Sequence, residues 1–227
     1  MFGVFGLEII AESFKYGIKY HNTMVKTTRK EIKLSVKEKL LKYLIENKNP
    51  QSIRSASGAI AVDYKNIHNL VKELQQDVIS KEKIGNTNLI KINLLPSREI
   101  FSVENKRTAQ FLRENKQLEL AKKDIENASY PFLIVLIFGS YVKKTKSKKS
   151  DIDICIICDN LKESKKIISK LELLPIKLEV HNFTAKEFES MLKTKENNVG
   201  KEIVKNNIIL YGTESYYNLI SKWMRKE

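Results

Sequence analysis

The apolar positions divide the chain into a helical first part and a later part in which strands and helices alternate. In the first part, two segments have apolar residues at helical spacing, a short helix fits residues 52–59 between them, and two β-rich runs, 78–83 and 88–94, follow. Ser35 and Glu38 form a capping box at the start of the first segment. This order of three helices and a hairpin predicts a winged helix-turn-helix over residues 30–96.

The third of these helices, which Asp63 can cap, presents polar side chains on its outer face. They are of the types that reach bases and phosphates, namely Tyr64, Lys65, Asn66, His68, Asn69 and Lys72. The pattern predicts binding of duplex DNA through this helix. The alternative is a winged helix that serves dimerisation or contact with another protein.

The later part predicts an α/β (α+β) domain with a small mixed sheet over residues 130–227. A charged helix over 103–129 precedes it, within a connecting region 97–129, and is either a linker or, as we favour, the first helix of the next domain. The expected strands are 132–138, 151–158, 176–183 and 208–211, and the expected helices are 161–172, 184–194, 197–206 and 214–226. Residues 1–29 match neither domain pattern and are treated as an extension, with Met24 as the expected natural start.

Acidic residues occur close to a glycine, in the region where one predicted strand ends and the next begins. A buried strand ends in Gly139 and Ser140, and the next strand opens with Asp151 and Asp153, which alternation places on one face. On the strand after that, Glu179 lies on the opposite face from its apolar neighbours. Such carboxylates can share a divalent cation, and Mg²⁺ suits carboxylates together with phosphates.

Several residues are candidates for holding a triphosphate. Gly139 lets the backbone approach a phosphate closely, and Ser140 and the amides after it can donate hydrogen bonds to phosphate oxygens. Lys201 and Lys205 lie four apart on one predicted helical face and can attract the same charge. The lysine run 143–149 is either a solvated loop or a guide for a triphosphate or a nucleic-acid acceptor.

The sequence G-S, a spacer of about ten residues and then D-h-D resembles the DNA polymerase β-type nucleotidyltransferase superfamily, in its minimal branch. The later segment GKEIVKNNIILYG, from Gly200, is similar to archaeal members that carry an N-terminal winged helix. The resemblance implies transfer of a nucleoside monophosphate from an NTP to a hydroxyl. It also implies two Mg²⁺ ions at Asp151, Asp153 and Glu179, and contact of the triphosphate with Gly139 and Ser140.

The sequence departs from the superfamily pattern at two places. Glu179 stands where Asp is usual, and Val142, Lys143 and Lys144 stand where Ala-Arg-Gly is frequent. Two functions therefore remain open. The first is an enzyme that transfers AMP from ATP to a protein, nucleic-acid or small-molecule hydroxyl. The second is a DNA-binding regulator whose nucleotidyltransferase-like domain is a weak nucleotide sensor or a dimerisation unit.

Charge and composition indicate the kinds of partner and the cellular compartment to expect. The formal net charge is +14, which favours polyanionic partners such as nucleic acid or nucleotides over a role in solubility alone. The two cysteines, Cys155 and Cys158, are too few for a disulfide framework and are expected to be buried in a cytoplasmic protein. The longest apolar run, 132–138, is far shorter than the span of about 20 residues that crosses a membrane, so no membrane partner is expected. A homodimer stays open.

Overall fold

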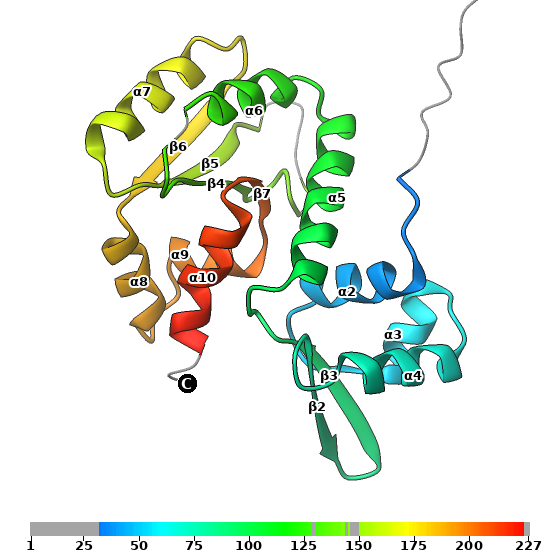
Figure 1. Ribbon diagram of the computed structural model, residues 1–227. Helices are drawn as coiled ribbons and strands as arrows, with labels where there is room; N and C mark the ends of the chain where they lie inside the picture. The colour runs from blue at the N-terminus through cyan, green and yellow to red at the C-terminus, as the bar shows by residue number, and fades with distance from the viewer. Residues whose placement is uncertain (1–31, 129, 144, 146–149, 225–227) are drawn as a thin grey trace, which may run out of the picture. The chain divides into compact units, whose positions relative to one another are not determined.

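The computed structural model describes residues 32–128, 130–143, 145 and 150–224. The predicted extension 1–29 and most of the lysine run 143–149 lie outside these residues. Two sheets organise the chain from Ile32 onward, and each has its own set of helices (Figure 1).

The first sheet belongs to the helical part of the chain. Its strands β1 (Gln51–Ser52), β2 (Ile79–Ile84) and β3 (Thr87–Ile92) form an antiparallel sheet in the order β1-β3-β2. The helices are α2 (Val36–Glu46), α3 (Ile53–Ile60) and α4 (Tyr64–Leu74). Ser35 and Glu38 form both bonds of the predicted capping box, and the Asp63 side chain caps α4. The element order predicted for residues 30–96 is thus present.

The second sheet is mixed, as predicted. Its order is β6-β5-β4-β7, with β5 and β6 parallel and the other two pairs antiparallel. These strands are β4 (Ile134–Phe138), β5 (Ile152–Ile157), β6 (Leu178–Phe183) and β7 (Ile208–Tyr211). Helices α6 (Leu118–Glu126) and α7 (Leu161–Glu172) cover one face, and α8 (Ala185–Lys193), α9 (Val199–Lys205) and α10 (Thr213–Met224) cover the other (Figure 1). The α/β fold class is confirmed.

Alternation along β5 divides the core between these two helical layers. Ile154 and Ile156 pack on the side of α6 and α7, whereas Cys155 and Ile157 pack on the side of α8 and α10. Both cysteines are buried and free, and burial raises the pKa of the Cys155 thiol well above its usual range. Asp153 shares the face of Cys155, which determines where its carboxylate can act.

The single helix predicted over 103–129 is wrong. The structure has α5 (Arg98–Glu114), then a break, and then α6. Asn115 causes the break, because its side-chain amide donates to the Phe111 carbonyl and its backbone N–H donates to the Leu112 carbonyl. Asparagine side chains compete in this way with the helical backbone. Among the helices that the structure describes, none is long and apolar enough to cross a membrane.

A buried polar network joins α5 to β7 and α10. Arg107 is 2.5 Å from the carboxylate of Glu104, and the Tyr217 hydroxyl donates to that carboxylate at 2.7 Å. Arg107 also donates to the carbonyl of Asn207, and Thr108 donates to the carbonyl of Ile209. Buried charges require such partners, so the network fixes α5 against the edge strand β7.

Candidate functional site

Three side chains that can bind a metal meet on the face of the mixed sheet that carries α8 and α10. Asp153 on β5 is in register with Glu179 on β6, and His181 follows two residues later on the same face. One ligand atom from each lies within 4.8 Å of the others. The predicted convergence of carboxylates from two adjacent strands is therefore present for Asp153 and Glu179.

Gly139 allows the Asp153 carboxylate to take its position. Gly139 follows the buried strand β4 and has a φ of 70°, a conformation that favours glycine. A Cβ at this residue would lie 2.0 Å from Oδ2 of Asp153. The Ser140 N–H donates a hydrogen bond to the same carboxylate. The Ser140 amide at the glycine–serine bend thus fixes the Asp153 carboxylate, and the strand register places Asp153 next to Glu179.

The electrostatics of Asp153 favour a bound cation. Burial raises the pKa of Asp153, and the nearby negative charge of Glu179 raises it further. His181 and the Ser140 amide act in the opposite direction on this pKa. A positive ion beside Asp153 and Glu179 would offset the cost of burying the Asp153 charge and would reduce the repulsion between the two carboxylates.

His181 lies beside the two carboxylates. From the sequence it could lie at the edge of the site or be an ordinary strand histidine, and the second was the favoured expectation. Its Nε2 lies 3.3 Å from Oε1 of Glu179. The rings of His181 and Phe138 are arranged edge to face with centroids 5.3 Å apart, and the rings of His181 and Phe183 stack with centroids 6.5 Å apart. The alternation that places Glu179 and His181 on one face was the signal in the sequence.

Asp151 lies apart from this group. It is exposed and immediately precedes β5, because the strand begins at Ile152 rather than at Asp151. It borders a surface hollow formed mainly by residues of α7 and β6, including Leu171 and Val180, which belong to the other face of the sheet. Its role as a metal ligand therefore stays a prediction from the sequence motif.

The lysines predicted to hold phosphate take up different positions. The Lys201 ammonium donates to the carbonyl of Thr194, at the end of α8. Lys205 is exposed and lines a cavity together with Lys143. Lys143 in turn forms a 2.6 Å ion pair with Glu202 on α9, a contact that no sequence pattern indicated.

The outer face of α4 has the exposure that a contact surface needs. The predicted DNA-binding residues Tyr64, Lys65, Asn66, Asn69 and Lys72 are exposed, and His68 is half-buried. The rings of Tyr64 and His68 stack with centroids 6.0 Å apart. The opposite face of the helix is buried through Ile67 and Val71.

Comparisons with solved structures give only remote likenesses. One is Lactococcus lactis ZitR, wild type, in complex with DNA, with 12% identity, coverage of 54% of this chain and 86% of that chain, and a TM-score of 0.29. Another, described as a toxin–antitoxin with AMP-PNP, has 18% identity, coverage of 46% and 86%, and a TM-score of 0.28. TM-scores this low do not establish a shared fold. A search of curated proteins found no match.

A family model gives a more specific result. Residues 110–216 match the family described as polymerase beta, nucleotidyltransferase. The matched segment begins within α5 and contains the mixed sheet, the glycine–serine bend and the cluster of Asp153, Glu179 and His181. The match supports the assignment of this domain to the polymerase β-type nucleotidyltransferase superfamily.

Proposed function

We propose that the chain is a metal-dependent nucleotidyltransferase that transfers AMP from ATP to a hydroxyl group of another molecule. The observation that carries this proposal is the Asp153 carboxylate, which is held at the glycine–serine bend within reach of Glu179 and His181. The family match of the surrounding segment supports the same reaction class. The acceptor hydroxyl can belong to a protein, a nucleic acid or a small molecule.

The cluster suits a divalent cation. Asp153 and Glu179 offer carboxylate oxygens, the ligands that Mg²⁺ prefers, and His181 adds an imidazole that Mn²⁺ tolerates better. When bound, the cation would stabilise negative charge on the phosphate and on the attacking and leaving oxygens. Asp151 is proposed as a further carboxylate ligand, on the strength of the sequence motif alone.

The remaining steps fall to residues of the chain. Gly139 and the Ser140 hydroxyl would contact the phosphates at the bend. Glu179 is exposed and would accept the proton of the acceptor hydroxyl. The acceptor oxygen then forms a bond to the α-phosphorus, the bond from that phosphorus to the bridging oxygen breaks, and pyrophosphate leaves with the electron pair.

The test combines transfer with cation binding. The protein is incubated with α-labelled ATP and either Mg²⁺ or Mn²⁺ in a lysate of the cells that produce it, and labelled acceptors are separated. Binding of Mn²⁺ is followed by electron paramagnetic resonance. We expect Asp153→Asn to abolish both signals, and Asp77→Asn, at an exposed turn before β2, to leave both unchanged. Normal labelling by Asp153→Asn would refute the proposal.

Asp151 can be tested separately in the same assay. If Asp151 coordinates the ion, as the sequence motif predicts, Asp151→Asn lowers Mn²⁺ affinity because a direct ligand is lost. If the carboxylate stays in the exposed position before β5, the substitution leaves Mn²⁺ affinity unchanged and only Asp153→Asn and Glu179→Gln weaken it. Either result decides whether Asp151 belongs to the metal site.

We further propose that α4 binds duplex DNA. The exposed polar face with Lys65, Asn66 and Lys72 supports this role, since these side chains can reach phosphates and base edges. The test measures binding to labelled genomic duplex fragments over a range of salt concentrations. Lys72→Ala should weaken binding and reduce the salt slope by about one. Lys186→Ala, at an exposed position on α8, is the matched control. Equal effects of both variants would contradict the proposal.

A further inference from the structure

A cavity of about 480 Å³ lies apart from the carboxylate cluster, between α2, α5, the turn after Gly139 and the end of α9. Neither Asp153, Glu179 nor His181 lines it. The volume falls within the range of about 300–1,000 Å³ that is common for small-molecule sites. The cavity is therefore large enough for one nucleotide.

Cations dominate the charged lining of this cavity. They are Lys42, Lys48, Arg107, Lys143 and Lys205, against two acidic residues, Glu46 and Glu114. Glu46 pairs with Lys42 at 2.8 Å and with Arg107 at 3.4 Å, and Lys143 pairs with Glu202 at 2.6 Å, so these charges partly compensate one another. Lys205 is exposed at the rim, where its ammonium can reach a ligand. The lining therefore favours an anion.

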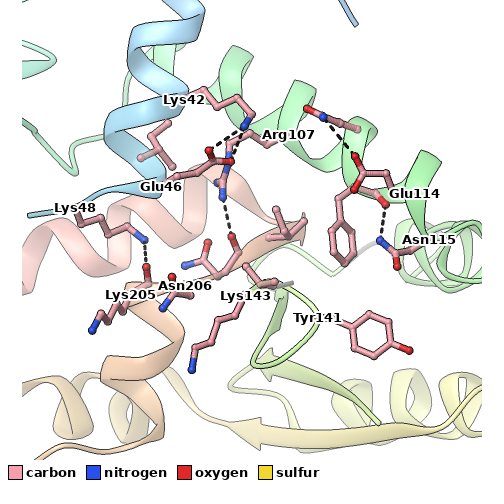
Figure 2. Close-up of a pocket in the computed structure, with 16 residues that line it drawn as sticks. Lys42, Glu46, Lys48, Arg107, Glu114, Asn115, Tyr141, Lys143, Lys205 and Asn206 are labelled. Atoms are coloured by element: carbon pink, nitrogen blue, oxygen red, sulfur yellow. Dashed lines mark hydrogen bonds and ion pairs between the residues drawn. The ribbon is translucent and has the colours of Figure 1, made fainter. Parts of the chain in front are cut away.

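The polar and aromatic groups are distributed unevenly around the cavity. Figure 2 shows Tyr141, Glu114 and Asn115 toward one end, and Lys48 and Lys205 toward the other. An aromatic ring can stack on a base, and a carboxylate such as that of Glu114 can accept a hydrogen bond from a base edge or a ribose hydroxyl. Ammonium groups at the other end suit phosphates. One ligand with a planar base and phosphates matches both ends.

We propose that this cavity binds a nucleotide, with its base near Tyr141 and its phosphates near Lys143 and Lys205. The site is separate from that of the transfer reaction proposed above, because none of the residues of the Asp153 cluster lines the cavity. A nucleotide there would contact α2 of the helical part and α9 of the nucleotidyltransferase part at the same time. Two sources share this chemistry, a free nucleotide and the terminal nucleotide of a single-stranded nucleic acid.

The lack of a metal requirement gives a direct test. Isothermal titration of the full chain with ATP is carried out in EDTA, which leaves no divalent cation at the Asp153 cluster. We expect one ATP to bind, and Asp153→Asn to bind it with the same affinity. Lys205→Glu should weaken binding at least tenfold, which corresponds to one charged hydrogen bond. The control Lys186→Glu changes the net charge equally at an exposed position outside the cavity and should stay within twofold.

The base end is tested with a second pair of probes. Tyr141→Leu keeps an apolar side chain but removes the ring, and should weaken ATP binding at least fivefold, as loss of one stacking contact does. The same variant should bind inorganic triphosphate as the parent does. If a short oligoadenylate binds through Lys205 and Tyr141 where ATP does not, the source is a nucleic-acid end. The proposal fails if neither probe binds in EDTA, or if Asp153→Asn rather than Lys205→Glu removes binding.

Discussion

Replacement of Gly139 by alanine tests how the Asp153 carboxylate is held. The new Cβ would lie 2.0 Å from Oδ2 and 2.8 Å from Cγ of Asp153, closer than non-bonded atoms approach. The backbone at Gly139 also has a positive φ of 70°. The substitution should therefore displace the carboxylate, break its bond to the Ser140 N–H and remove the metal site.

The free-energy cost can be worked out from two contributions. A left-handed conformation costs alanine about 1–2 kcal/mol. Loss of the hydrogen bond between the Ser140 N–H and Asp153 adds about 1.5–3 kcal/mol, near the lower value because Asp153 is half-buried. We expect Gly139→Ala to lower the free energy of unfolding by about 2.5–3.5 kcal/mol, measured by urea denaturation.

Gly85 supplies the matched control. It has a similar φ of 58°, but an added Cβ would meet nothing within 4 Å. Gly85→Ala should therefore cost only the conformational share, about 1–2 kcal/mol, and the effect of alanine on the unfolded chain is the same at both positions. In an Asp153→Ala background, which removes the clashing atoms, Gly139→Ala should cost no more than Gly85→Ala. A cost of Gly139→Ala that is equal with and without Asp153 would refute the reasoning.

The remaining predictions concern stability. Tyr217→Phe removes the hydroxyl that donates to buried Glu104 and should cost about 1.5–3 kcal/mol, whereas Tyr216→Phe, which loses a bond to a neutral amide, should cost about 1 kcal/mol. If Tyr217→Phe and Tyr216→Phe lower the free energy of unfolding equally in urea denaturation, the hydrogen bond of Tyr217 to a buried charged Glu104 is contradicted. The hydrogen bond from Lys106 lowers the pKa of Glu38 to about 2, so Glu38→Gln should cost about 1 kcal/mol above pH 4.5. The difference in stability between Glu38→Gln and the parent should vanish as the pH falls toward 2, because the hydrogen bonds that lower the pKa of Glu38 stabilise only its ionised form.

Periodicity and capping were enough to predict most elements. The helix over 161–172 was predicted with the bounds that the structure gives, because its apolar stripe is bracketed by Asn160 as N-cap and by the turn after Glu172. Strand bounds were less accurate, and β5 begins at Ile152 rather than at Asp151. The alternation of polar and apolar residues extends beyond the end of the strand, whereas the strand itself begins where its backbone hydrogen bonds to the neighbouring strands begin.

The site could be predicted only where local patterns and register agree. Asp153 and Glu179 were predicted to converge because two adjacent strands place alternate residues on one face, and Gly139 was predicted because a buried strand ends there. The ion pair of Lys143 with Glu202 and the position of Lys205 in the cavity depend on how α9 packs against the turn, which no local pattern in the sequence encodes. Long-range packing therefore accounts for what the sequence left open.

Asp153 should destabilise the protein when no cation is bound. Burial and the charge of Glu179 raise its pKa above that of an unfolded aspartate, so the stability it contributes is lost as the pH rises through the folded pKa. At neutral pH, Asp153→Asn should therefore raise the melting temperature of the protein in EDTA, since the amide keeps an acceptor for the Ser140 N–H and carries no charge. In Mn²⁺ the order should reverse, because only the aspartate gains stability from binding the ion. An aspartate that served the fold alone would give the same order of melting temperatures in both buffers.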